Sequence, residues 1–114
     1  MIVKDIVALL DGKYANNSGL ENTDYDTAFA SDLMSDVLTI EKNNVLLITG
    51  LSNVQVIRTA DMADIRCVVV GRNKMISSEM IELAKDSDIT LISCRYSLFY
   101  ISGLLYSKGV KPLY

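Results

Sequence analysis

The sequence contains no histidine and no tryptophan, and it has only one proline and two cysteines among its 114 residues. The missing histidine excludes the usual catalytic triads, because their serine or cysteine nucleophile needs an imidazole as its base. It also leaves no partner with which Cys67 and Cys94 could complete a zinc site. We therefore predict that both cysteines are buried, reduced thiols, which are typical of a cytoplasmic protein.

The chain also lacks any run of basic residues, since its 11 lysines and arginines are scattered and its formal net charge is −3. Binding of nucleic acid needs a basic surface that displaces counterions from phosphates, so we expect no nucleic-acid partner. No apolar stretch approaches the ~20 residues that span a bilayer. The N-terminus carries Lys4 and Asp5 inside its apolar pattern, unlike a signal peptide. We expect a cytoplasmic protein with no membrane partner.

Hydrophobic residues make up 50% of the chain, which is enough for one core at this length, and we predict a single domain over residues 1–114. A short apolar run followed by a segment with helical periodicity recurs three times. The runs are Val45–Thr49, Cys67–Val70 and Thr90–Ser93, and the helical segments begin near Ser52, Ser77 and Ser97. This alternation predicts an α/β fold with a mainly parallel sheet of about four to five strands, in a two-layer or three-layer sandwich.

The first part of the chain has weaker signals. Residues 4–10 have the spacing of a short helix, which we expect to end at Gly12. Short strands are expected at 13–15 and 27–30, separated by a polar loop. Ser31 then resembles a helix cap, and Ser52 with Gln55 has the spacing of a capping box.

Polar residues gather where the predicted strands end. Ligands of open parallel sheets bind beyond the carboxyl ends of the strands, where helix N-termini favour anions. We therefore predict a site for a small anionic ligand, such as a nucleotide, with two arginines that could contact phosphate. Its candidate residues are Ser31, Asp32, Thr49, Ser52, Asn53, Arg72, Arg95 and Ser97. The alternative is that the hydroxyls only cap helices and the arginines are solvated.

The sequence shows no arrangement of catalytic residues. The loop 49–53 lacks the glycine spacing and the lysine of a phosphate-binding loop. Asp32 and Asp36, four residues apart, could hold a divalent ion in an enzyme of unrecognised type, although such sites need more oxygen ligands. We expect no catalytic residue, and the sequence points to no particular cofactor.

The last predicted helix has apolar side chains around its whole circumference. A helix of that kind is covered on more than one side, so one face should pack on the sheet and another should meet a second copy of the chain. The residues expected in this homodimer interface are Leu98, Phe99, Ile101, Leu105 and Tyr106. The alternative is a deep position covered by the N-terminal helix and the asparagine-rich loop.

Several segments, in their order and spacing, resemble the DRTGG domain family. They are residues 30–38, 47–53, 55–60, 79–84 and 96–99, so the resemblance covers most of the chain from about Ala28 onward. The Asp-Arg-Thr-Gly-Gly string that names the family is absent. The resemblance implies a fold like that of the N-terminal domain of HPr kinase.

The resemblance also implies a role. Members of the family act as regulatory or dimerising modules without established catalysis, and free-standing members often accompany iron-hydrogenase components. The leading hypothesis is therefore a non-catalytic regulatory and dimerisation module that senses a small anionic or nucleotide ligand and acts through protein partners. The alternative is a nucleotide- or phosphate-binding domain that serves as a subunit of a larger enzyme complex.

Overall fold

Four parallel strands form the middle of one six-stranded sheet, in a computed structural model that describes residues 1–114. The strand order is β1-β5-β4-β3-β2-β6, with β1 antiparallel to β5 at one edge and β6 parallel to β2 at the other. The strands are β1 (Lys13–Asn16), β2 (Thr27–Ala30), β3 (Val45–Thr49), β4 (Cys67–Val70), β5 (Thr90–Ser93) and β6 (Lys111–Pro112).

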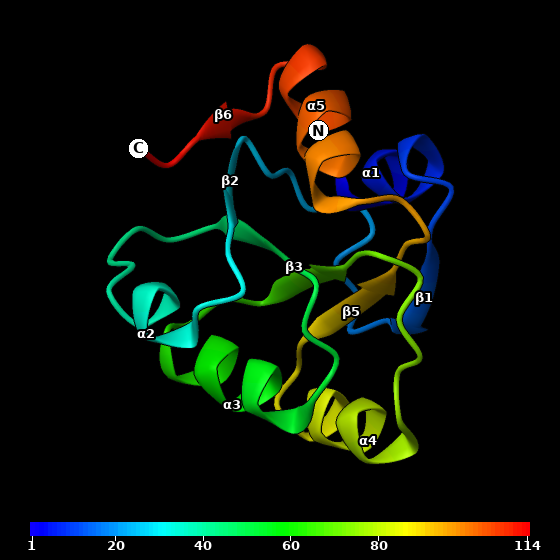
Figure 1. Cartoon of the computed structure of the whole chain (residues 1–114), viewed down its shortest axis with the longest axis vertical. Coiled ribbons are helices and arrows are strands. Elements are labelled where there is room, and N and C mark those ends of the chain that lie inside the picture. The colour runs from blue at the N-terminus through cyan, green and yellow to red at the C-terminus, as the bar shows by residue number, and fades with distance from the viewer.

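Five helices cover the two faces of this sheet and make a three-layer α/β/α sandwich (Figure 1). From β2 to β5 each connection steps to the next strand in the same direction, so right-handed crossovers put their helices on one face. The connection from β5 to β6 runs back, which puts its helix on the other face. The first face carries α2 (Met34–Val37), α3 (Val54–Met62) and α4 (Ser78–Asp86), and the second carries α1 (Val3–Leu9) and α5 (Leu98–Ser107).

The central strands are buried on both faces. Every residue of β3 and β4 is buried, which explains why these strands are unbroken apolar runs rather than alternating patterns. Side chains that point to one face pack under α2, α3 and α4, and those that point to the other pack under α1 and α5. Cys67 and Cys94 are free and buried, as predicted.

The structure corrects several local predictions. The sheet has six strands, because the two residues of β6 add a strand that the sequence did not reveal. Ser31 does not cap a helix; its hydroxyl accepts from the amide of Leu33 in a turn. The cap of α3 is Asn53, without a side-chain bond, so the predicted capping box of Ser52 is wrong. The helix α1 ends through Asp11, which has a φ of 49°, rather than through Gly12.

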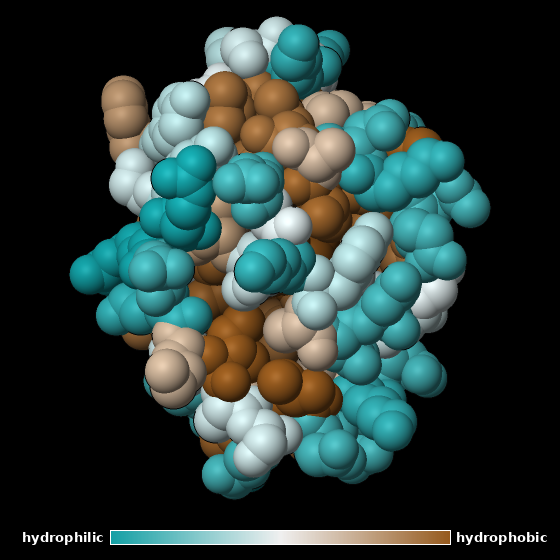
Figure 2. Space-filling view, turned by 90° about the vertical axis from the view of Figure 1, so that its right-hand side faces the viewer, coloured by the Kyte–Doolittle hydropathy of each residue, from teal (hydrophilic) through white to brown (hydrophobic).

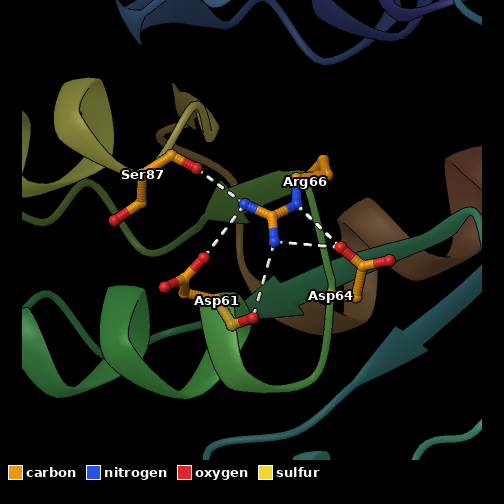
Figure 3. A network of polar contacts seen from close by, with 4 residues as sticks. All are labelled: Asp61, Asp64, Arg66 and Ser87. Carbon is orange, nitrogen blue, oxygen red and sulfur yellow. Dashed lines mark hydrogen bonds and ion pairs between the residues drawn. The ribbon is translucent and has the colours of Figure 1, made fainter.

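Arg66 connects the turns at the amino-terminal edge of the sheet by hydrogen bonds (Figure 3). Its guanidinium donates to the carboxylates of Asp61 and Asp64 at 3.0 and 2.9 Å and to the backbone carbonyl of Ser87 at 2.6 Å. Partial burial opposes the charge of Arg66, but the hydrogen bonds to Asp64 and Asp61 hold its pKa above the usual value. This network joins the turns that follow α3 and α4, so the polar residues at this edge of the sheet stabilise the fold.

None of the five helices combines the length and the hydropathy needed to cross a membrane.

Candidate functional site

The loops after β2 and β3 are joined at the carboxyl edge of the sheet by one carboxylate. Asp32 accepts hydrogen bonds from the Thr49 hydroxyl at 2.9 Å and from the Gly50 amide at 2.7 Å. The side chain of Arg72 also lies against Gly50, where a Cβ on the glycine would be 2.9 Å from the Arg72 Cδ and 3.4 Å from the Asp32 Oδ2. A small residue at position 50 therefore lets three loops approach one another.

The loops after β4 and β5 are joined through the backbone. The amide of Arg72 donates to the Tyr96 carbonyl at 2.7 Å, and the amide of Asn73 donates to the Cys94 carbonyl at 3.1 Å. Arg72 and Asn73 both have positive φ, 65° and 54°, which turns the chain away from β4 before α4 begins. These bonds hold the two loops side by side before one runs to α4 and the other to α5.

A hollow of about 350 Å³ opens where these two loops diverge. This is the point at which the direction of the chain connections reverses, the place where open α/β sheets bind ligands. Figure 2 views the side of the molecule at which β4 and β5 end, and hydrophilic side chains there flank a band of hydrophobic ones. We call the hollow between the loops after β4 and β5 the cationic hollow. It is lined by Asp11, Gly12, Lys13, Asn73, Lys74, Ser93, Cys94 and Arg95.

Positive charge dominates this hollow, since three cations and one carboxylate line it. Arg95 forms an ion pair with Asp11 at 3.3 Å. Lys13 and Lys74 take part in no ion pair, so two positive charges remain unbalanced. In a protein of net charge −3, such a concentration of positive charge favours an anionic ligand.

The thiol of Cys94 forms part of the wall of the hollow. The thiol donates a hydrogen bond to the Leu10 carbonyl oxygen at 3.2 Å, and its Sγ accepts one from the Tyr96 amide at 3.4 Å. Burial raises the pKa of this thiol, although the Tyr96 amide and the charge of Arg95 act in the opposite direction. Cys94 is therefore a neutral, packed wall residue rather than an exposed nucleophile.

The fold is similar to that of a solved structure, although no sequence comparison finds a match. No family model and no curated protein sequence matches the chain. One solved structure with a similar fold contains the CBS and DRTGG domains of the regulatory region of Clostridium perfringens pyrophosphatase, complexed with an activator, diadenosine tetraphosphate. The match has a TM-score of 0.74 at 17% identity and covers 91% of this chain and 45% of that chain. The chain has a DRTGG-like fold.

Within this DRTGG-like domain, the predicted site residues fall into separate groups. Arg95 alone lines the cationic hollow. Asp32, Thr49 and Arg72 meet around Gly50, where Asp32 holds two loops together instead of capping its own helix. Ser97 caps α5 by accepting from the Tyr100 amide, and Ser31 forms a turn. The side chains of Ser52 and Asn53 make no hydrogen bond.

Neither unpaired lysine of the hollow, Lys13 or Lys74, was among the site residues predicted from the sequence. Lys13 begins β1 and reaches the hollow only because β1 pairs antiparallel with β5, opposite Ser93. Nothing local in the sequence indicates that pairing. Lys74 belongs to the loop after β4, from which Arg72 was predicted, so the rule that ligands bind at the carboxyl edge of a parallel sheet could also have identified Lys74.

Asp32 and Asp36 were the candidate ligands of a divalent ion. Asp36 makes no bond to Asp32, and no group of three or more potential metal ligands occurs.

The residues of α5 that were predicted to form a dimer interface are partly buried and partly exposed. Ile101 and Leu105 are buried in the chain's own core, so they are not available to a partner and that part of the prediction is corrected. Leu98 is half-buried against the same core. Phe99 and Tyr106 are 90% and 70% exposed. The helix is thus covered by the sheet on one side only.

Proposed function

We propose that this chain is a non-catalytic regulatory module that binds a small phosphate-bearing ligand in the cationic hollow. The observation that carries the proposal is the pair of unbalanced lysines, Lys13 and Lys74, at the reversal point of an α/β sheet. The solved relative supports the regulatory role, because it is a regulatory region in complex with a nucleotide activator.

We also propose which protein this module regulates. The resemblance of the sequence to free-standing DRTGG domains favours iron-hydrogenase components of the cytoplasm as partners. The alternative proposal is a ligand-binding subunit of a larger enzyme complex, and it is supported by the solved structure, in which the CBS and DRTGG domains form the regulatory region of a pyrophosphatase. Purification of the native protein separates the two: a stable complex of fixed stoichiometry supports the subunit, and a free protein supports the regulator.

Removal of the two lysines tests the binding site. ADP and inorganic pyrophosphate are expected to raise the Tm of the wild-type protein, because a ligand that binds only the folded state stabilises it. Lys13→Ala combined with Lys74→Ala should weaken binding at least about tenfold, since charge-assisted hydrogen bonds contribute about 1.5–3 kcal/mol each. Thermal shift and isothermal titration calorimetry measure both effects.

The matched control makes the same change of charge elsewhere. Lys85 and Lys108 are exposed, lie outside the hollow and form no ion pair, so Lys85→Ala with Lys108→Ala should bind both anions like the wild type. Equal weakening by both double variants would mean that only net charge matters, and the hollow would not be the site.

Self-association is the second function that we propose, and the outer face of α5 is the surface that supports it. Phe99, Ser102, Gly103 and Tyr106 have the i, i+3, i+4, i+7 spacing of one helical stripe. Two exposed aromatic rings flank two small residues, and a Cβ on Gly103 would have nothing within 4 Å. Two copies related by a twofold axis could place each ring over the small residues of the other.

An apolar groove lies beside this stripe and adds to the surface. It has a volume of about 160 Å³, and its lining includes Leu105 and Tyr106 of α5, Val110 of the segment that follows α5, and Ala28 of β2. Phe99→Ser with Tyr106→Ser is expected to convert a dimer to a monomer in sedimentation at micromolar concentration. Met62→Ser removes an equally exposed apolar side chain from α3 and should leave the dimer intact. A wild-type protein that sediments as a monomer would contradict this proposal.

A further inference from the structure

Among the three cations of the cationic hollow, Arg95 is the one whose side chain is held by other side chains. The central carbon of its guanidinium lies 4.8 Å from the centroid of the Tyr96 ring, and its Nε donates to Asp11 at 3.3 Å. The Tyr96 ring in turn meets the Tyr100 ring edge to face, with centroids 4.6 Å apart. Tyrosine therefore supports one side of the guanidinium and a carboxylate holds its edge, while the side chain is still 62% exposed.

The cations of the hollow differ in what they can contribute to a ligand. The charge of Arg95 is already balanced by Asp11, whereas Lys13 and Lys74 have no ion-pair partner. A lysine ammonium is a compact charge suited to phosphate. A guanidinium that already lies on an aromatic ring offers a flat, weakly hydrated face, on which a nucleobase stacks.

We propose that Arg95, held by Tyr96 and Asp11, is the base-stacking platform of the hollow, so that the hollow takes a nucleotide in preference to a simple phosphate. This inference rests on the proposed function and deepens it by assigning each part of the ligand. The base lies on the outer face of the Arg95 guanidinium, and the phosphates lie against Lys13 and Lys74. The Tyr96–Tyr100 pair fixes the platform before the ligand arrives, which lowers the conformational entropy that binding must remove.

A comparison of ADP with inorganic pyrophosphate tests the platform, because both carry a diphosphate and only ADP carries a base. The wild-type protein is expected to bind ADP at least about tenfold more tightly than pyrophosphate, as stacked bases usually contribute that much. Arg95→Lys keeps the charge and removes the flat face, so it should bring the two affinities within about twofold of each other. Tyr96→Leu removes the support of the platform and should act in the same direction.

Isothermal titration calorimetry measures these affinities, and tyrosine fluorescence gives a second readout since the chain has no tryptophan. Arg58→Lys on α3, outside the hollow, is the matched control and should keep the wild-type preference for ADP. Equal wild-type affinities for ADP and pyrophosphate would overturn the platform and leave the proposed function standing. Equal weakening of both ligands by Arg95→Lys would make Arg95 a phosphate contact and would also overturn it. Failure of both ligands to bind would overturn the proposed function itself.

Discussion

Gly71→Ala is expected to lower the free energy of unfolding by about 2–3 kcal/mol, although it adds a single methyl group. Gly71 follows β4, and a Cβ there would lie 2.8 Å from the Ile101 side chain, 3.0 Å from the Tyr96 carbonyl oxygen and 3.1 Å from the Leu98 side chain. The backbone carbonyl is fixed by its bond to the Arg72 amide, so it cannot move aside without breaking that bond. The added methyl would push α5 away from the sheet.

Urea denaturation followed by circular dichroism measures this loss, and the chain supplies its own control. Gly103 lies inside α5 with open space around it, so Gly103→Ala should stabilise the protein by about 0.5–1 kcal/mol. Both variants are best compared at sub-micromolar concentration, where self-association does not contribute. A Gly71→Ala protein as stable as the wild type would show that α5 is not tightly seated on the end of β4.

Stability is expected to fall steeply as the pH rises from 9 to 12. Burial raises the pKa of the Cys67 thiol from 9.0 to about 12 and that of the Tyr25 phenol from 10.0 to about 12. Below pH 9 both groups are protonated in the folded and unfolded states, so they add no pH dependence. The unfolded chain releases the Cys67 proton above about pH 9 and the Tyr25 proton above about pH 10, while the folded chain retains both, and stability is lost until the pH reaches the folded pKa. Each pH unit in this window costs about 1.4 kcal/mol per group.

Two variants separate the contributions of these groups. Cys67→Ala should reduce the slope of the decline over the whole range from pH 9 to 12, and most completely between pH 9 and 10, where the thiol titrates in the unfolded chain before the phenol does. Tyr25→Phe should reduce it between pH 10 and 12. Urea midpoints recorded at each pH with a reductant present measure the slopes. Slopes that stay unchanged in both variants would mean that other groups cause the alkaline instability.

The central sheet was predictable from the sequence because its strands are buried on both faces. Burial on both sides leaves an unbroken apolar run such as Val45–Thr49, and Ser77 and Ser97 cap the helices that they were expected to begin. The two residues of β6 carry no such pattern, because a short edge strand at Pro112 needs neither a long run nor a full set of amide donors. The prediction of a capping box at Ser52 was wrong because the N-cap of α3 is Asn53, one residue later, and the helix begins at Val54.

The candidate site was less predictable, for a physical reason. The rule that ligands bind at the carboxyl edge identified the correct loops, yet it could not decide which side chains face each other there. Asp32 accepts the hydrogen bonds of Thr49 and Gly50, so a residue that looked free for a ligand joins two loops, and the Arg72 side chain lies beside Gly50 rather than in the hollow. On α5, the small residues Ser102 and Gly103 were recognisable as a point of close approach, but an apolar pattern around the whole helix could not show that Ile101 and Leu105 face the chain's own core.

The pairing of the edge strands determines when the cationic hollow comes into existence during folding. Neighbouring central strands are close in sequence, as residue 46 pairs with 67 and 67 with 90, whereas residue 13 pairs with 93 and residue 27 with 111. Contacts between such distant residues form late, because closing a long chain segment has a large entropic cost. Lys13 enters the wall of the hollow only through its pairing with Ser93, so a partly folded chain with only the central strands has no complete receptor. Occupancy of the hollow would therefore report that the last edge of the sheet has closed.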